Sequence, residues 1–230
     1  MTSGGAGQDA SRSPEGQSPP RGGIEIRTGP FHWGMLEDGW VYLLVDCSGS
    51  MAGDKLQQAK DGAMRFARDA VAKGYSVGLI EFYGIANHLC EPTMDMSILQ
   101  RHIDTLKAKK AGAVQAFIGA FRRGIYGTNI GQAISIARDK LNERKGIKAI
   151  VLITDGQANG PGDPQASLEI GEKAKAESID VITIGTDDAD QSFLKKLASR
   201  AELGVKVSRD HLEDTIASSA RWLTGGKAES

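Results

Sequence analysis

Apolar runs that alternate with helix-like segments constrain the fold of this chain more than any other feature of its sequence. Residues 40–46 and 148–154 are almost continuously apolar, which is typical of strands buried on both faces of a sheet. Between such runs, apolar residues recur at helical spacing, for example over residues 56–70. The alternation predicts an α/β fold: a doubly wound, mostly parallel sheet with helices on both faces.

Turn and capping residues place the remaining elements. Residues 75–82 and 85–90 flank a short turn and predict a hairpin, which gives the sheet one antiparallel edge strand. Asp54 followed by Gln57 forms a capping-box pattern and predicts that a helix begins there and runs to Gly74. Further helices are expected over residues 96–109, 130–141, 163–178, 193–198 and up to 223, and further strands over 180–185 and 204–208.

Length and composition indicate one folded domain with flanking segments. A chain of 230 residues with 40% hydrophobic content can bury one sizeable core. Residues 1–23 contain 13 Gly, Ser or Pro residues and almost no apolar side chains, so we expect a disordered tail there. The predicted organisation continues with an N-terminal extension over 24–39, the folded domain over 40–224 and a flexible C-terminus over 225–230.

Charge and cysteine content narrow the choice of partners and compartment. The formal net charge of -1 provides no overall attraction to nucleic acid or to an acidic membrane, and no apolar run is long enough to span a bilayer. The sequence has two cysteines, Cys47 and Cys90, and nothing at its start resembles a secretory signal. We therefore expect a cytoplasmic protein whose cysteines stay unpaired, because at least one strand should separate them.

Oxygen ligands stand at the ends of predicted strands. Asp46, Ser48 and Ser50 follow the first strand, Thr128 precedes a later helix, and Asp155 closes another strand. Because ligand sites of doubly wound sheets lie at the carboxyl ends of the strands, we expect these side chains to converge. Two carboxylates and three hydroxyls suit Mg²⁺ or Mn²⁺ better than Zn²⁺ or Ca²⁺.

The motifs DCSGSM, GTNIGQAI and VLITDG resemble the metal-ion-dependent adhesion site (MIDAS) of von Willebrand factor A (VWA) domains, and the resemblance covers residues 40–224. It implies an intact site in which Asp46, Ser48 and Ser50 supply the first loop, Thr128 the second and Asp155 the third. It further implies that the ion completes its coordination with a carboxylate of a partner protein. The implied setting is that of bacterial, intracellular, stand-alone VWA proteins, which work beside AAA-type ATPases or in kinase and phosphatase systems.

Two other functions stay open at this point: a metal-dependent hydrolase, and a structural subunit in which the ion only stiffens loops. A phosphatase of the haloacid-dehalogenase type needs a second acid where Ser48 stands, and no histidine lies near Cys47 in the sequence to activate its thiol. A phosphate-binding P-loop motif is also absent from the sequence. These features favour a binding module over an enzyme.

A basic segment lies between the predicted metal loops. Residues 105–138 contain six Lys or Arg residues and no acidic residue. We predict that Lys109, Lys110, Arg122 and Arg123 contact an acidic partner surface beside the metal. One alternative is that the apolar side of this segment packs on the domain and its basic side is only solvated. The other is an amphipathic membrane contact.

Overall fold

A six-stranded sheet forms the centre of the part of the chain that the structure describes. The computed structural model describes residues 38–109, 129–156 and 163–223. The strand order is β3-β2-β1-β4-β5-β6, and all neighbours are parallel except β2 and β3. This confirms the predicted mostly parallel sheet with an antiparallel edge strand. The strands are β1 (Gly39–Asp46), β2 (Tyr75–Phe82), β3 (Ala86–Thr93), β4 (Ile147–Thr154), β5 (Ile179–Thr186) and β6 (Gly204–Val207).

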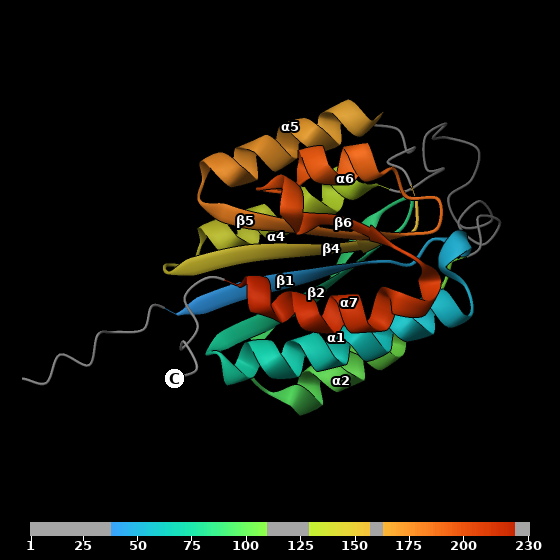
Figure 1. The fold of residues 1–230 in the computed structure, drawn as a ribbon. Coiled ribbons are helices and arrows are strands. Elements are labelled where there is room, and N and C mark those ends of the chain that lie inside the picture. The colour runs from blue at the N-terminus through green and yellow to red at the C-terminus, as the bar shows by residue number, and fades with distance from the viewer. Residues whose placement is uncertain (1–37, 110–128, 157–162, 224–230) are drawn as a thin grey trace, which may run out of the picture. The chain divides into compact units, whose positions relative to one another are not determined.

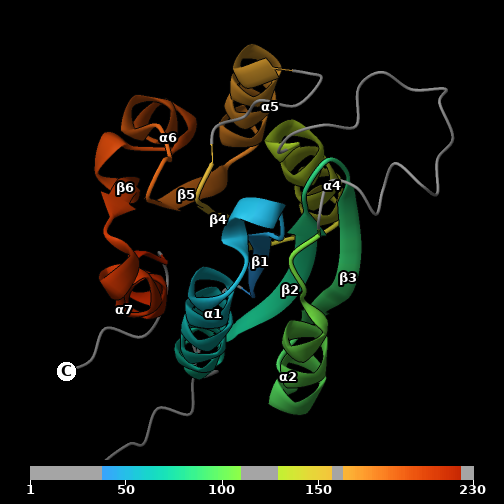
Figure 2. The same cartoon turned by 90° about the vertical axis from the view of Figure 1, so that its right-hand side faces the viewer.

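Helices cover both faces of this sheet (Figure 1 and Figure 2). One face carries α1 (Asp54–Ala72), α2 (Met96–Thr105) and α7 (Leu212–Ser218), and the other carries α4 (Ile130–Asn142), α5 (Asp163–Ala176) and α6 (Gln191–Leu197). Short 3-10 helices lie at η1 (Gly49–Met51), η2 (Ala201–Leu203), η3 (Arg209–His211) and η4 (Ser219–Trp222). The last predicted helix is therefore α7 continued by η4.

Alternating side chains of β1 explain why its sequence is apolar without a break. Val41 and Leu43 point into the core beneath α1, whereas Tyr42 and Leu44 point into the core beneath α4. All four are fully buried. Successive side chains of a strand face opposite sides, so a strand covered on both sides needs apolar residues at every position.

Helix α1 begins at Asp54, as predicted, but the capping role predicted for Asp54 and the predicted end of α2 were wrong. Gly53, and not Asp54, is the N-cap of α1, because the chain leaves η1 through a positive φ of 79° that favours glycine. Helix α2 ends at Thr105 and does not reach Lys109. The backbone N–H of Lys109 donates to the carbonyl oxygen of Cys47 at 2.8 Å, and this bridge requires extended backbone.

Several predictions concern residues outside the described ranges. These are the tail, most of the N-terminal extension, the C-terminus, the basic segment after Lys109, and the candidate ligand Thr128. Within the described ranges, no helix combines the length and apolarity needed to cross a membrane.

The strand order creates a switch point between β1 and β4. The chain leaves β1 towards β2 on one side, and β4 later adds to β1 on the other side. The parallel register pairs Val45 with Ile153 and Thr154 with Gly185, so β1, β4 and β5 end at one edge of the sheet. Ligand sites of doubly wound sheets lie at such an edge.

Candidate metal centre

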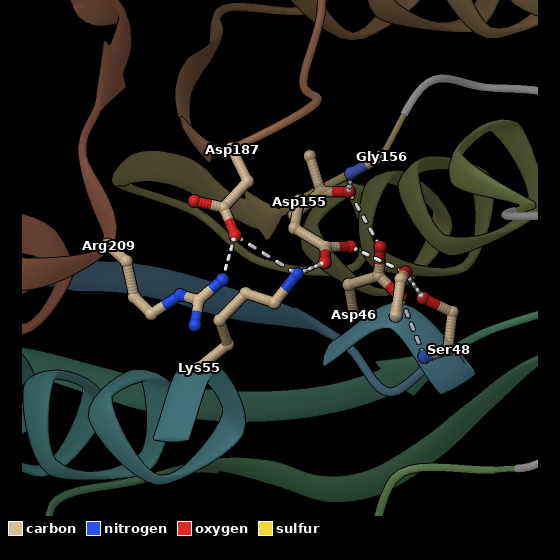
Figure 3. A network of polar contacts seen from close by, with 9 residues as sticks. Asp46, Ser48, Lys55, Asp155, Gly156, Asp187 and Arg209 are labelled. Atoms are coloured by element: carbon tan, nitrogen blue, oxygen red, sulfur yellow. Dashed lines mark hydrogen bonds and ion pairs between the residues drawn. The ribbon is translucent and has the colours of Figure 1, made fainter. Parts of the chain in front are cut away.

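Asp46 is the last residue of β1 and is fully buried. Its Oδ1 accepts a hydrogen bond from the backbone N–H of Ser48 at 2.8 Å, and its Oδ2 accepts one from Thr154 Oγ1 at 2.6 Å. The same Thr154 hydroxyl accepts a hydrogen bond from the backbone N–H of Gly156 at 3.1 Å. These bonds fix the Asp46 carboxylate between the ends of β1 and β4 (Figure 3).

The turn at η1 connects this carboxylate to a second one. Ser48 Oγ lies 3.0 Å from Ser50 Oγ, and Ser50 Oγ donates to Asp155 Oδ1 at 2.8 Å. The Asp155 side chain is only 1% exposed, whereas Ser50 is exposed, so the cluster opens to solvent on the side of η1. The structure thus brings together Asp46, Ser48, Ser50 and Asp155, four of the five predicted ligands.

The start of α4 bears on the fifth predicted ligand, Thr128. Asn129 caps α4 by accepting a hydrogen bond from the backbone N–H of Gln132 at 3.0 Å. Its own backbone N–H donates to the carbonyl oxygen of Tyr83, directly after β2, at 2.7 Å. The α4 cap is therefore supplied by Asn129, and Thr128 itself lies outside the described residues.

The two buried carboxylates of Asp46 and Asp155 favour the binding of a cation between them. Burial raises the pKa of Asp46 to about 6, hydrogen bonds from Thr154 and Ser48 oppose this rise, and the charge of Asp155 adds to it. The direct contacts that Asp46 makes are with neutral donors. A divalent ion would offset the cost of burying both charges.

The donors of this cluster are all oxygen atoms. Carboxylates and hydroxyls fit hard cations such as Mg²⁺ and Mn²⁺, which the sequence also predicts. Among the residues whose positions are described, no group of three or more His, Cys, Asp or Glu side chains is placed to hold a metal. The cluster combines two acids with hydroxyls, and it lacks the nitrogen and sulfur ligands of structural zinc sites.

The sequence analysis missed a neighbouring group of charged residues. Lys55 Nζ donates to Asp155 Oδ2 and lies 3.2 Å from Asp187 Oδ2, while Arg209 Nη2 lies 2.8 Å from the same oxygen of Asp187 (Figure 3). Two signals were available. Lys55 is the second residue of α1, where the helix dipole disfavours a cation, and Asp187 follows directly after β5.

The contacts within this group favour the charged forms of Lys55 and Asp187. Burial alone would lower the pKa of Lys55, but hydrogen bonds to Asp155 and Asp187 raise it above the usual value. The hydrogen bond from Arg209 lowers the pKa of Asp187, and Lys55 lowers it further. The ammonium of Lys55 is therefore shared between two carboxylates, one of them a predicted metal ligand.

Lys109, one of the predicted partner-binding residues, already has contacts within the chain. Its Nζ lies 3.6 Å from Glu81 Oε1 and 5.9 Å from the centroid of the Tyr83 ring. Its side chain is 34% exposed. Lys110, Arg122 and Arg123 lie outside the described residues.

The cysteines are buried and free, as predicted. Strand β2 lies between Cys47, which follows β1, and Cys90 in β3. Burial raises the pKa of Cys47 to about 12, and the nearby charge of Glu81 adds to the effect. Cys47 therefore behaves as a small apolar residue and is unsuited to act as a thiolate nucleophile.

Comparison with protein families and solved structures identifies relatives of this fold. A family model described as the von Willebrand factor type A domain matches residues 41–216. The vWF domain of the type V pili tip protein Mfa5 from Porphyromonas gingivalis is 14% identical with a TM-score of 0.69, covering 84% of this chain and 98% of that chain. Proximal thread matrix protein 1 from the mussel byssus, solved with a zinc-occupied MIDAS motif, is 19% identical with a TM-score of 0.60, covering 80% of this chain and 46% of that chain.

A curated relative is similar in sequence over most of the folded domain. The magnesium-chelatase 67 kDa subunit of Heliobacterium mobile is 29% identical over 175 residues, which cover 70% of this chain. The match covers 24% of the relative, so the chain spans about a quarter of that protein's length.

Proposed function

Because the chain belongs to the von Willebrand factor type A domain family, we propose that it is a metal-dependent protein-binding module. The observation that carries this proposal is the convergence of Asp46, Ser48, Ser50 and Asp155 at the switch point of the sheet. We propose that Thr128 completes the ligand set and that the MIDAS is intact. All five residues match the family motif in type and order.

The proposed ion is Mg²⁺ or Mn²⁺. Both prefer oxygen donors and near-octahedral coordination that leaves room for water or a further ligand. The zinc-occupied MIDAS of the mussel protein makes Zn²⁺ the competitor to be tested.

The residues around the ion would hold it and present it to a partner. Hydrogen bonds from Ser48 and Thr154 orient the Asp46 carboxylate before any ion arrives. Ser50 is exposed, so its hydroxyl can turn from Asp155 towards an ion without repacking the core. The bound ion supplies an electrophilic position, and an acidic residue of the partner would occupy it.

The basic segment is the proposed second contact with the partner. Lys109 is partly neutralised by Glu81, so in this proposal Lys110, Arg122 and Arg123 carry most of the attraction to an acidic surface. Such charges steer association and are screened by salt.

The proposed setting is a cytoplasmic multiprotein assembly, either with an AAA-type ATPase or in a kinase and phosphatase system. The Heliobacterium mobile relative is by name a subunit of a larger enzyme, which supports a role in an assembly. Two free, buried cysteines are compatible with a reducing compartment.

We propose no catalytic activity for the chain. Cys47 is fully buried with a raised pKa, and the candidate metal ligands match the MIDAS motif of a binding domain. A metal-dependent hydrolase is the alternative. Phosphatase and esterase assays with and without Mg²⁺ decide between them, because metal-dependent turnover that Asp46→Ala abolishes would establish the hydrolase.

Calorimetry tests the metal site. Wild type should bind one Mg²⁺ or Mn²⁺ weakly, because three of the five ligands are neutral hydroxyls, and Asp46→Ala should lose the binding heat. Asp61→Ala is the matched control, since Asp61 is an exposed acid of α1 that bonds Gln57. Undiminished heat in Asp46→Ala would refute the assignment.

Affinity purification in Mg²⁺ tests the binding role. Proteins that bind wild type and Asp61→Ala but not Asp155→Ala are the expected partners. Partners that bind all three equally would indicate a structural subunit in which the ion only stiffens loops.

A further inference from the structure

Lys55 occupies an unusual place for a lysine. It is the second residue of α1, where the positive end of the helix dipole repels a cation. Its side chain is only 12% exposed. Two carboxylates compensate for this position, because Nζ contacts Asp155 Oδ2 and lies 3.2 Å from Asp187 Oδ2.

The contact with Asp155 competes with the proposed metal. One oxygen of Asp155 accepts the hydroxyl of Ser50 and the other accepts the ammonium of Lys55. An ion held by Asp155 would bring two positive charges next to a third one on Lys55, in a place where little water screens them. Lys55 must therefore weaken its contact with Asp155 when the ion binds.

Asp187 is a second carboxylate with which Lys55 can pair. It follows β5, the strand beside β4, so its carboxylate stands next to that of Asp155 at the same edge of the sheet. Arg209 Nη2 lies 2.8 Å from Oδ2 of Asp187, the same oxygen that Lys55 faces (Figure 3). Asp187 is 24% exposed, so an ion pair there costs less desolvation than one at Asp155, which is 1% exposed.

We propose that Lys55 is a resident cation of the metal site: it neutralises Asp155 in the metal-free protein and shifts fully to Asp187 when a divalent ion binds. Lys55 thereby lowers the affinity for the ion, and Asp187 limits this loss by accepting the displaced ammonium. This inference rests on the proposed metal site and adds to it a positioning pair that lies outside the predicted ligand set.

A double-mutant cycle tests the exchange. Lys55→Met removes the charge and keeps a long, unbranched side chain. Asp187→Asn removes the negative charge that would receive the ammonium, while keeping a residue type that tolerates the positive φ of 47° at this position. Lys60→Met is the matched control, because Lys60 also lies on α1 but its Nζ donates to the carbonyl oxygen of Asp104.

Mn²⁺ titrations by calorimetry compare the affinities of these variants with that of wild type. Lys55→Met should bind Mn²⁺ about tenfold more tightly than wild type, and Asp187→Asn several-fold more weakly. In the Lys55→Met background, Asp187→Asn should change the affinity by less than about twofold, because no ammonium needs a new partner. Lys60→Met should match wild type, and Lys55→Met should melt at a lower temperature than Lys60→Met in EDTA.

The outcomes separate this inference from the proposed function. If wild type binds Mn²⁺ and Lys55→Met binds it equally or more weakly, Lys55 does not compete and the inference is wrong while the metal site stands. An Asp187→Asn effect of equal size in both backgrounds would also overturn it, since Asp187 would then act on the ion directly. If neither wild type nor Lys55→Met binds any ion, the metal site itself is refuted. Circular dichroism of each variant in EDTA verifies the fold.

Discussion

The buried charge of Asp46 lowers the free energy of unfolding when no metal is bound, and a single substitution should remove this penalty. Asp46 is fully buried, bonds neutral donors, and stands near the charge of Asp155. Asp46→Asn has nearly the same shape, keeps an oxygen to accept the Ser48 N–H, and removes the charge. We expect this variant to lose metal binding and to be more stable than wild type when no metal is present.

The magnitude follows from the shift of one titration. The pKa of Asp46 rises from 3.8 to about 6 on folding. A carboxyl group whose pKa is higher in the folded protein than in the unfolded one does not reduce stability at pH values below its unfolded-state pKa. Stability is then lost as the pH rises through its folded-state pKa. A shift of about two units corresponds to about 3 kcal/mol in the free energy of unfolding near pH 7.5, and to about half as much near pH 5. The gain from Asp46→Asn should be somewhat smaller, because the hydroxyl of Thr154 loses its charged acceptor.

Urea unfolding in EDTA measures this directly. Asp46→Asn should unfold at higher urea than wild type near pH 7.5, and the difference should shrink near pH 5. Added Mg²⁺ should stabilise wild type and leave the variant unchanged. The exposed substitution Asp61→Asn serves as the control for a lost surface charge. Equal stabilities of wild type and Asp46→Asn at neutral pH in EDTA, or a difference that does not depend on pH, would refute the reasoning.

Three further predictions concern the core, a thiol and the basic segment. Gly78→Ala should lower the free energy of unfolding by about 1–3 kcal/mol in urea melts, because the added Cβ would stand 2.4 Å from Cε1 of the buried Tyr42 ring. Cys47 should react with Ellman's reagent only after unfolding, since it is fully buried; a fast reaction in the native protein would contradict this. With a partner in hand, reversing Arg122 and Arg123 to Glu should slow association and flatten its salt dependence in kinetic binding measurements, and an unchanged rate would leave the segment as ordinary solvated surface.

Strands were easier to predict from this sequence than helix ends. Strands β1 and β4 are buried on both faces, so their positions show directly as unbroken apolar runs. The N-cap of α1 depends on the backbone angles of Gly53, and the end of α2 depends on a bridge between Lys109 and Ser48. The first depends on backbone dihedral angles and the second on a contact between residues far apart in the chain. Neither can be read from the local pattern of apolar and polar residues.

The same distinction applies to the candidate site. Asp46 and Asp155 could be predicted because each follows an apolar strand and because strand ends of a doubly wound sheet meet. Thr154 was overlooked as a functional residue because it reads as the end of an apolar run, although its hydroxyl connects Asp46 to Gly156. Its role became visible only once β1 and β4 were paired.

Lys55 shows why a ligand motif alone does not determine how tightly a site holds its ion. The five predicted ligands are two carboxylates and three hydroxyls, and this set alone takes no account of a cation that already contacts Asp155. Lys55 reaches Asp155 across a hundred residues of sequence because Gly53 sets where α1 begins and β4 runs beside β1. Its ammonium cancels one of the two charges in the metal-free protein, so ion binding becomes an exchange of cations at Asp155. The affinity then depends on Asp187, which takes up the displaced charge, as much as on the residues that contact the ion.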